Sequence, residues 1–139
     1  MDKKRILIID DEPSFTRMVR LNLEKTGRFE VREENAATRA LSVAREFKPD
    51  LVLLDVLMPD MDGVAACRHI KQNEHAKDIP IIMVTAKNDL GNLQEAFSAG
   101  AMDYIAKPVN GVELHARVSS ALTLKREMDH RKAREADLL

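Results

Sequence analysis

Residues 6–11 read ILIIDD, four consecutive aliphatic side chains followed by two aspartates. Residues 51–54 (LVLL) and 79–84 (IPIIMV) are two further short runs in which apolar residues do not alternate with polar ones. Such runs are typical of central strands in a parallel sheet, because helices cover both faces of that sheet. Residues 29–32 (FEVR) alternate, which predicts an edge strand, and residues 103–106 (DYIA) are a shorter fifth candidate.

The segments between these strands carry apolar residues at helical spacing. Within residues 40–47, apolar side chains occupy positions 40, 43, 44 and 47, the spacing of one face of a helix. Residues 15–23 and 90–97 repeat that spacing in whole or in part. Strands that alternate with amphipathic helices form a parallel sheet with right-handed crossovers. The sequence therefore predicts an α/β fold, a doubly wound (βα)5 arrangement with a five-stranded parallel sheet.

Length, charge and cysteine content exclude several classes of protein. The 139 residues have the size of one domain, and 22 Lys and Arg against 23 Asp and Glu leave a net charge of −1. This balance argues against binding nucleic acid through bulk charge. A single cysteine excludes a disulfide framework and a cysteine-rich zinc site. The four apolar residues near the start are fewer than a secretory signal (about 7–15) or a membrane span (about 20) needs, so we expect a cytoplasmic chain.

Polar residues follow the predicted strands at their carboxyl ends. Asp10 and Asp11 end the first strand, Asp55 ends the third and Thr85 the fourth, and Lys107 follows the fifth. Ligands of open α/β sheets bind outside these strand ends. We therefore expect five side chains from distant parts of the sequence to meet at one edge of the sheet.

The three carboxylates of this group would repel one another unless some are protonated or a cation lies among them. Oxygen ligands suit Mg²⁺ or Mn²⁺ rather than zinc, and such an ion often completes its shell with phosphate oxygens. Lys107 adds a positive charge and Thr85 adds a hydroxyl donor. The set as a whole fits a phosphoryl group.

We expect the phosphoryl group on the protein itself or on a small molecule, not on a nucleotide. The sequence has neither G-x-x-x-x-G-K-[ST] nor G-x-G-x-x-G, the glycine-rich loops that hold nucleotide phosphates. A carboxylate can act as nucleophile and form an aspartyl phosphate. Asp55 is the candidate nucleophile, because Asp10 and Asp11 are adjacent and form a metal-binding pair.

Each of these residues also has a purely structural explanation. The aspartate pair before Pro13 fits a helix cap. Lys107 and Pro108 fit an ordinary turn, and Thr85 fits a strand-end hydroxyl. Each explanation is reasonable alone, but all of them together do not account for the convergence at one edge.

Four segments share their order and spacing with a known family: residues 8–12 (IIDDE), 53–63 (LLDVLMPDMDG), 84–86 (VTA) and 100–108 (GAMDYIAKP). With these segments the chain resembles the receiver domain of bacterial two-component response regulators. The similarity covers residues 4 to about 124. It implies a flavodoxin-like sheet with strand order 2-1-3-4-5.

The resemblance implies roles for the carboxylates. Asp55 matches the phosphoacceptor, which receives its phosphoryl group from the phosphohistidine of a sensor histidine kinase or a phosphotransfer protein. Asp10 and Asp11 match the acidic pair that holds Mg²⁺ (or Mn²⁺) together with Asp55 and the backbone carbonyl of Leu57. The implied partner is therefore a kinase, and the implied cofactor is a divalent cation.

The resemblance also implies roles for three other side chains. Lys107 matches the lysine that neutralises the phosphoryl oxygens, and its bond to Pro108 matches the cis peptide of the family. Thr85 matches the switch hydroxyl that moves onto the phosphoryl group. Tyr104 matches the switch aromatic that turns inward as Thr85 moves.

Two variable positions of the family flank the path of water to the acceptor. Leu57, two residues after Asp55, has no group that orients water. Lys87, two residues after Thr85, is in place to contact the phosphoryl group. We therefore expect slow autodephosphorylation.

The resemblance implies a signalling switch rather than an enzyme, one that assists its own Mg²⁺-dependent phosphotransfer and controls an output domain or a partner. A phosphorylation-dependent homodimer through residues 90–97, Tyr104 and the last helix is part of this expectation. One alternative, a haloacid-dehalogenase-like phosphatase, needs a second acid two residues after the nucleophile, where this chain has Leu57. Another alternative is a pseudo-receiver, a binding module that is never phosphorylated, but no site residue is lost.

The last predicted helix continues past the part that the sheet needs. Nine of the fifteen residues from Lys125 onward are charged, and no Gly or Pro interrupts them. We therefore divide the chain into a receiver at residues 1–124 and a helical extension at residues 125–139. The extension is either a solvated helix or a connector that pairs with a copy of itself or leads to an output domain beyond Leu139. Its nearly balanced charges do not favour direct binding of nucleic acid by this chain.

Overall fold

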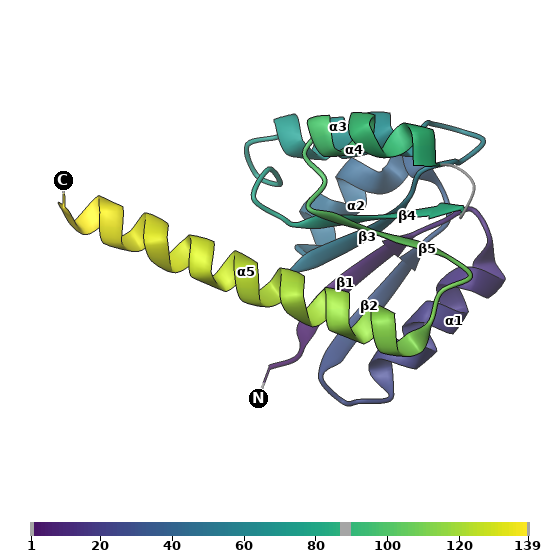
Figure 1. The fold of residues 1–139 in the computed structure, drawn as a ribbon, viewed down its shortest axis with the longest axis horizontal. Helices are drawn as coiled ribbons and strands as arrows, with labels where there is room; N and C mark the ends of the chain where they lie inside the picture. The colour runs from purple at the N-terminus through teal and green to yellow at the C-terminus, as the bar shows by residue number, and fades with distance from the viewer. Residues whose placement is uncertain (1, 87–89, 139) are drawn as a thin grey trace.

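The computed structural model describes residues 2–86 and 90–138 and contains a five-stranded parallel sheet in the order β2-β1-β3-β4-β5 (Figure 1). This order and the α/β class confirm the flavodoxin-like prediction. The strands are β1 (Lys4–Ile9), β2 (Phe29–Glu34), β3 (Leu51–Asp55), β4 (Ile81–Ala86) and β5 (Asp103–Lys107). The α-helices are α1 (Pro13–Glu24), α2 (Ala40–Phe47), α3 (Gly63–Gln72), α4 (Leu93–Ser98) and α5 (Gly111–Leu138), with 3₁₀ turns η1 (Ala37–Arg39) and η2 (Leu90–Asn92).

Helices cover both faces of the sheet, as the unbroken apolar runs predict. Figure 1 shows α2, α3 and α4 on one face, with α1 and α5 on the other. In β1, for example, Leu7 and Ile9 belong to the first layer of the core, and Ile6 and Ile8 belong to the second. The central strands are therefore buried on both faces.

Strands β2 and β4 differ in how closely they follow their predictions. Strand β2 pairs only with β1 in the sheet order, and Phe29 and Val31 are buried while Glu30 is exposed, so the edge-strand prediction is confirmed. The strand expected at residues 79–84 begins two residues later, at Ile81. Pro80 has no N–H to donate to a ladder, although its carbonyl accepts the N–H of Val52 at 3.0 Å.

Helix α5 continues as one helix well beyond the sheet (Figure 1). Its 28 residues correspond to a length of about 42 Å. Its buried residues are Leu114, Val118 and Ala121, whereas Leu124 is 45% and Met128 39% exposed. No helix within the described ranges has the length and apolar character needed to cross a membrane.

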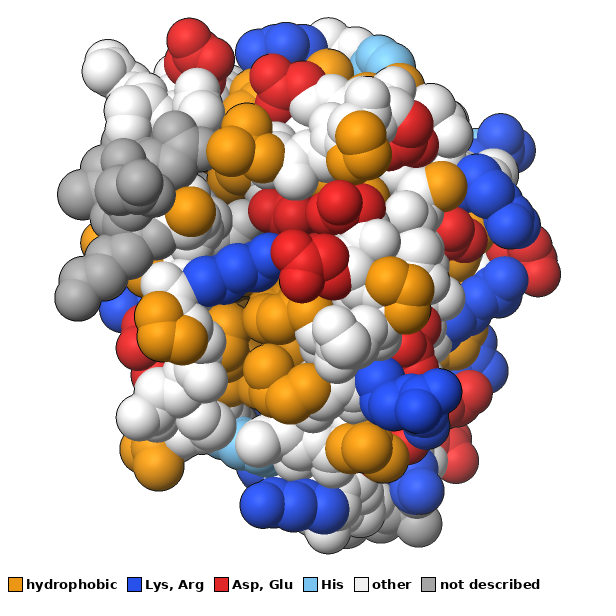
Figure 2. Space-filling view, turned by 90° about the vertical axis from the view of Figure 1, so that its right-hand side faces the viewer, with side chains coloured by type: hydrophobic (Ala, Val, Ile, Leu, Met, Phe, Trp, Pro, Cys, Tyr) orange, Lys and Arg blue, Asp and Glu red, His pale blue; other side chains and the backbone are white. Residues whose placement is uncertain are grey.

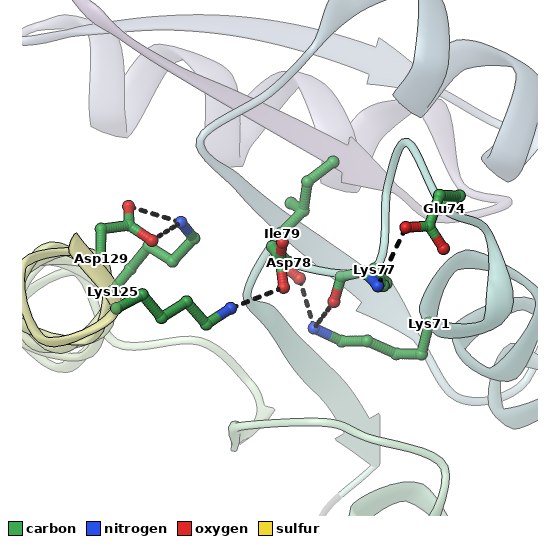
Figure 3. Close-up of polar contacts among 8 residues, drawn as sticks. Lys71, Glu74, Lys77, Asp78, Ile79, Lys125 and Asp129 are labelled. Atoms are coloured by element: carbon green, nitrogen blue, oxygen red, sulfur yellow. Dashed lines mark hydrogen bonds and ion pairs between the residues drawn. The ribbon is translucent and has the colours of Figure 1, made fainter. Parts of the chain in front are cut away.

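The extension touches the body of the protein at the loop between α3 and β4 (Figure 3). Lys71 reaches into this loop from α3, and its Nζ donates to the carbonyls of Lys77 at 3.1 Å and Ile79 at 2.6 Å. From the extension, Lys132 Nζ lies 3.1 Å from Asp78 Oδ1. Both partners of that ion pair are more than half exposed, so it contributes less than about 1 kcal/mol to stability.

Candidate functional site

The polar residues predicted to converge lie at the carboxyl edge of the sheet, which faces the viewer in Figure 2. Asp10 directly follows β1, Asp55 ends β3, Thr85 lies at the end of β4 and Lys107 ends β5. These four strands are consecutive neighbours in the sheet. Acidic side chains gather at the centre of this edge beside a basic one (Figure 2).

The structure brings the three aspartates into one cluster. One carboxylate oxygen from each of Asp10, Asp11 and Asp55 lies within 4.8 Å of the others. Asp10 is fully buried and Asp55 is 5% exposed, while Asp11 is the most exposed of the three. Buried carboxylates at this separation need a balancing positive charge or a shared proton.

Lys107 is the cation that balances this cluster. Its Nζ lies 2.9 Å from Asp10 Oδ2 and 3.7 Å from Asp55 Oδ2, and 4.4 Å from the ring centroid of Phe15. Asp10 Oδ1 accepts the N–H of Glu12 at 2.9 Å, whereas Asp10 Oδ2 has no aligned hydrogen-bond donor among the described residues and relies on this ion pair. One ammonium therefore serves two buried carboxylates.

The balance of charge at the site is visible in two pKa shifts. Burial, followed by the Asp10 carboxylate, raises the pKa of Asp55 to about 7, and Lys107 and the N–H of Leu57 oppose that rise only in part. For Lys107, burial opposes the charged form, but the carboxylates of Asp10 and Asp55 outweigh it and raise the pKa. Three carboxylates against the single ammonium of Lys107 leave a surplus of negative charge among the described side chains of this cluster.

A divalent cation fits this surplus. Three carboxylates in mutual reach form an all-oxygen ligand set, which suits Mg²⁺ or Mn²⁺, and Asp10 Oδ2 is a buried oxygen without an aligned donor. The backbone carbonyl of Leu57 stays a predicted fourth ligand. The N–H of Leu57 donates to Asp55 Oδ1 at 3.2 Å, which ties this residue to the acceptor.

The structural alternatives for these residues do not replace the site. Helix α1 has Glu12 at its N-cap without a side-chain cap bond, and Asp10 receives the N–H of Glu12 instead of capping the helix. The bond between Lys107 and Pro108 is cis, as the resemblance implied.

The two predicted switch residues lie in different surroundings. Thr85 is fully buried, and its Oγ1 lies 3.3 Å from the carbonyl of Ala86. Tyr104 is half-buried and packs edge-on against Phe97, with ring centroids 6.3 Å apart and an interplanar angle of 82°. The guanidinium of Arg117 lies 5.7 Å from the Tyr104 ring centroid. Tyr104 therefore belongs to the surface formed by α4, β5 and α5 rather than to the carboxylate cluster.

Of the two residues expected to flank the path of water, only one can be placed. The side chain of Leu57 is exposed beside the site. Lys87 lies outside the described residues.

Gly63 ends the segment 53–63 that resembles the family, and no role was predicted for it from the sequence. A Cβ at this position would lie 1.9 Å from the carbonyl oxygen of Asp55 and 2.8 Å from Val56 Cα. Its own N–H donates to the carbonyl of Val56 at 2.8 Å, and Asp62 caps α3 by accepting the N–H of Val64. The absence of a side chain lets α3 start directly against the acceptor strand.

We expect the metal-free protein to lose stability as the pH rises. Because the fold raises the pKa of Asp55 from about 3.9 to about 7, the folded state favours the protonated acid, and that contribution is complete below pH 4 and lost as the pH rises through 7. The expected loss is about 1–3 kcal/mol in the unfolding free energy, measured by urea unfolding from pH 5 to 8. Millimolar Mg²⁺ should restore it, because the cation offsets the carboxylate charge. Asp55→Asn is the control, and a wild-type profile that runs parallel to it would contradict the expectation.

Comparison with known proteins places this site in a family. The family model described as "Response regulator receiver domain" matches residues 6–119. The chain is 36% identical over 118 residues to the "DNA-binding dual master transcriptional regulator RpaA" of Synechocystis, an alignment of 85% of this chain and 48% of RpaA. It is 36% identical over 132 residues to "Response regulator PleD" of Caulobacter vibrioides, an alignment of 95% of this chain and 29% of PleD. This alignment therefore reaches into the extension. The chain thus spans half or less of these relatives.

A solved structure has the same fold and a metal in its cleft. It is the receiver domain of sensor histidine kinase PA1611 from Pseudomonas aeruginosa PAO1, described "with magnesium ion coordinated in the active site cleft". The two chains are 28% identical with a TM-score of 0.79, and the alignment covers 88% of this chain and 99% of the other.

Proposed function

Because this chain belongs to the response regulator receiver domain family, we propose that it is a phosphorylation-dependent switch of a two-component system with Asp55 as the phosphoacceptor. The observation that carries the proposal is the environment of Asp55, a nearly buried carboxylate between a second buried aspartate and a lysine at the carboxyl edge of the sheet. The partner that supplies the phosphoryl group is a sensor histidine kinase or a phosphotransfer protein.

The chemistry is a transfer from phosphohistidine to carboxylate. A carboxylate oxygen of Asp55 attacks phosphorus, an O–P bond forms as the P–N bond breaks, and the imidazole nitrogen keeps the electron pair of that bond. Lys107, which now balances Asp10 and Asp55, is in reach to pair with the phosphoryl oxygens. The chain assists this transfer to itself and is a signalling domain, not an enzyme that acts on an external substrate.

The residues that would hold the cation are Asp10, Asp11, Asp55 and the backbone carbonyl of Leu57. Mg²⁺ in that place supplies positive charge for the phosphoryl oxygens, and Mn²⁺ is an alternative. The carboxylate cluster and the raised pKa of Asp55 support this assignment. Without a cation, the raised pKa of Asp55 favours its protonated form, and a protonated carboxyl group cannot act as nucleophile.

The switch follows from the added charge. Phosphorylation adds about −1.5 to −2 charges and three acceptor oxygens at Asp55. The phosphoryl oxygens offer Thr85 and Lys107 new acceptors, so the equilibrium shifts toward conformations in which these two side chains reach them. Tyr104, whose ring packs against Phe97 and Arg117 in this structure, then turns inward and changes the surface formed by α4, β5 and α5.

Residues 1–124 form the receiver in this proposal, and residues 125–139 form a connector to an output domain or partner. The family match ends at residue 119, and the relatives are about twice as long as this chain or longer. The net charge of −1 does not favour direct nucleic-acid binding by this part of the protein.

An intact-mass measurement after incubation with acetyl phosphate and Mg²⁺ tests the proposed function. A phosphoryl adduct that Asp55→Asn removes supports it. Absence of any adduct in the wild type would leave the pseudo-receiver as the better description.

The phosphoryl group on Asp55 is expected to persist for minutes or longer. Leu57 presents only carbon atoms beyond its backbone and so cannot orient an attacking water molecule. The decay of the acyl phosphate, followed by intact mass after removal of acetyl phosphate, gives the half-life. A half-life of seconds would contradict the expectation.

Phosphorylation is also expected to promote a homodimer through α4, β5 and α5. The change begins at Thr85 and reaches this surface through Tyr104, whose ring contacts Phe97 and Arg117. Sedimentation velocity of the phosphorylated and unphosphorylated chain measures the effect, with Asp55→Asn as the control. An unchanged sedimentation coefficient on phosphorylation would argue for a monomeric switch.

A further inference from the structure

A chain of side-chain hydrogen bonds connects the edge of the sheet to the loop that carries the aspartate pair. Asn35, just after β2, donates from Nδ2 to the carbonyl of Asp10 at 2.7 Å and to Thr16 Oγ1 at 3.2 Å. Thr16, on α1, donates to Glu33 Oε1 at 2.7 Å. Arg20, one turn further along α1, pairs with the other oxygen of Glu33. Four side chains from α1, the end of β2 and the residue after it are thus linked by hydrogen bonds to the backbone carbonyl of Asp10.

In this series of hydrogen bonds, the ionisation of Glu33 decides which group donates and which accepts. Burial alone would raise the pKa of Glu33, but the hydrogen bonds from Thr16 and Arg20 outweigh it and lower the pKa, so Glu33 is ionised. An ionised carboxylate only accepts, so the Thr16 hydroxyl donates to it and has lone pairs left for Asn35. The two hydrogens of the Asn35 amide then match two acceptors, Thr16 Oγ1 and the Asp10 carbonyl.

Thr16 lies at the centre of this series of hydrogen bonds. It is fully buried, and its Oγ1 also lies 3.1 Å from the carbonyl of Pro13, within the first turn of α1. A buried hydroxyl that bonds both a charged side chain and an amide rigidifies the segment that contains it. The helix start and the aspartate pair before it are thereby tied to β2.

Three hydrogen bonds hold Asp10, two through its backbone and one through its side chain. Its N–H donates to the carbonyl of Glu34 at 3.1 Å, its carbonyl accepts from Asn35, and its Oδ1 accepts the N–H of Glu12. The carbonyl bond sets the plane of the peptide that joins Asp10 to Asp11. The orientation of that plane is one of the torsional constraints on where the Asp11 carboxylate lies relative to the other two.

We propose that Thr16 and Asn35 are positioning residues for the divalent cation: they orient the peptide between Asp10 and Asp11 so that both carboxylates face one ion together with Asp55. The inference rests on the proposed cation site. Neither residue lies in the carboxylate cluster itself, so their effect passes through the Asp10 carbonyl. Losing a group that orients a metal ligand typically weakens metal affinity tenfold or more.

The experiment compares Thr16→Val, which keeps the shape and loses the hydroxyl, with Thr16→Ser, which restores it, and with Asn35→Ala. Asn35 lies outside the hydrophobic core, so its removal leaves the core intact even if Thr16→Val folds poorly. Thr26→Val is the matched control, because Thr26 also bonds backbone groups, the carbonyl of Leu23 and the N–H of Arg28, but lies just beyond the other end of α1. Calorimetric titration with Mg²⁺ gives the Kd of each folded variant.

A second readout needs no metal. Amide exchange of the Glu12 N–H, which is bonded to Asp10 Oδ1, reports how well the loop is held. We expect Thr16→Val and Asn35→Ala to raise the Kd for Mg²⁺ about tenfold and to speed this exchange, while Thr16→Ser and Thr26→Val stay near the wild type. Unchanged Kd values in Thr16→Val and Asn35→Ala, with a wild type that binds Mg²⁺, overturn this inference alone. A wild type that neither binds Mg²⁺ nor forms the adduct overturns the proposed function as well.

Discussion

Acetyl phosphate and Mg²⁺ are expected to add one phosphoryl group to the wild-type chain and none to Asp55→Asn. The amide of asparagine is not a nucleophile at neutral pH, so the loss should be complete rather than partial. The fold should survive the change, because asparagine has the same shape and removes a buried carboxylate that repels Asp10. Intact-mass spectrometry measures the adduct directly.

Two controls make this result specific. Asp60→Asn changes an exposed carboxylate that accepts from the N–H and the hydroxyl of Thr38, and it should leave the adduct unchanged. Chelation of Mg²⁺ should remove the adduct from the wild type, because among the described residues only Lys107 then faces the charge of the cluster. An adduct that persists in Asp55→Asn would mean that another residue is the nucleophile.

Gly63→Ala is expected to cost about 3 kcal/mol or more of unfolding free energy. A Cβ at this position would lie 1.9 Å from the carbonyl oxygen of Asp55, and the neighbouring atoms are backbone atoms of Asp55 and Val56, which cannot rotate away. Overpacking of a buried position usually costs about 1–3 kcal/mol, and a clash with backbone belongs at the upper end. Urea unfolding measures the change.

The same substitution should impair the site. To relieve the clash, α3 must move away from β3 or the end of β3 must shift, and Asp55 is the last residue of that strand. A weaker Mg²⁺-dependent adduct in the folded fraction is therefore expected. Gly91→Ala is the matched control, because a Cβ there meets no atom within 4 Å. Equal stability of the two variants would show that the start of α3 is more adaptable than its contacts suggest.

The secondary structure and the site residues were predictable from local patterns. An unbroken apolar run such as residues 6–9 identifies a strand buried on both faces, and the polar residue after it marks the strand's carboxyl end. Asp10, Asp55, Thr85 and Lys107 could be placed at one edge for that reason, and the structure brings them there. The strand order came from the resemblance to receiver domains, since periodicity does not say which strands are neighbours.

Other features depended on distances between elements and could not be read from the chain. The raised pKa of Asp55 requires the burial and the approach of Asp10 that only the packed sheet creates. The role of Gly63 depends on how closely α3 approaches β3. Tyr104 was expected as a switch residue, but its neighbours Phe97 and Arg117 come from α4 and α5.

Burial periodicity is a property of neighbouring residues, so the strands, the helices and the polar residues at the strand ends could be predicted from the amino-acid order alone. Hydrogen bonds such as those of Asn35 to Asp10 and Thr16 join residues 25 and 19 positions apart. These hydrogen bonds form only when α1 packs beside β2 and β1 pairs with β2, because a hydrogen bond requires its donor and acceptor within about 3 Å. Those distances, and with them the electrostatics of Asp55 and the support of the aspartate pair, arise from the packing of helices against the sheet.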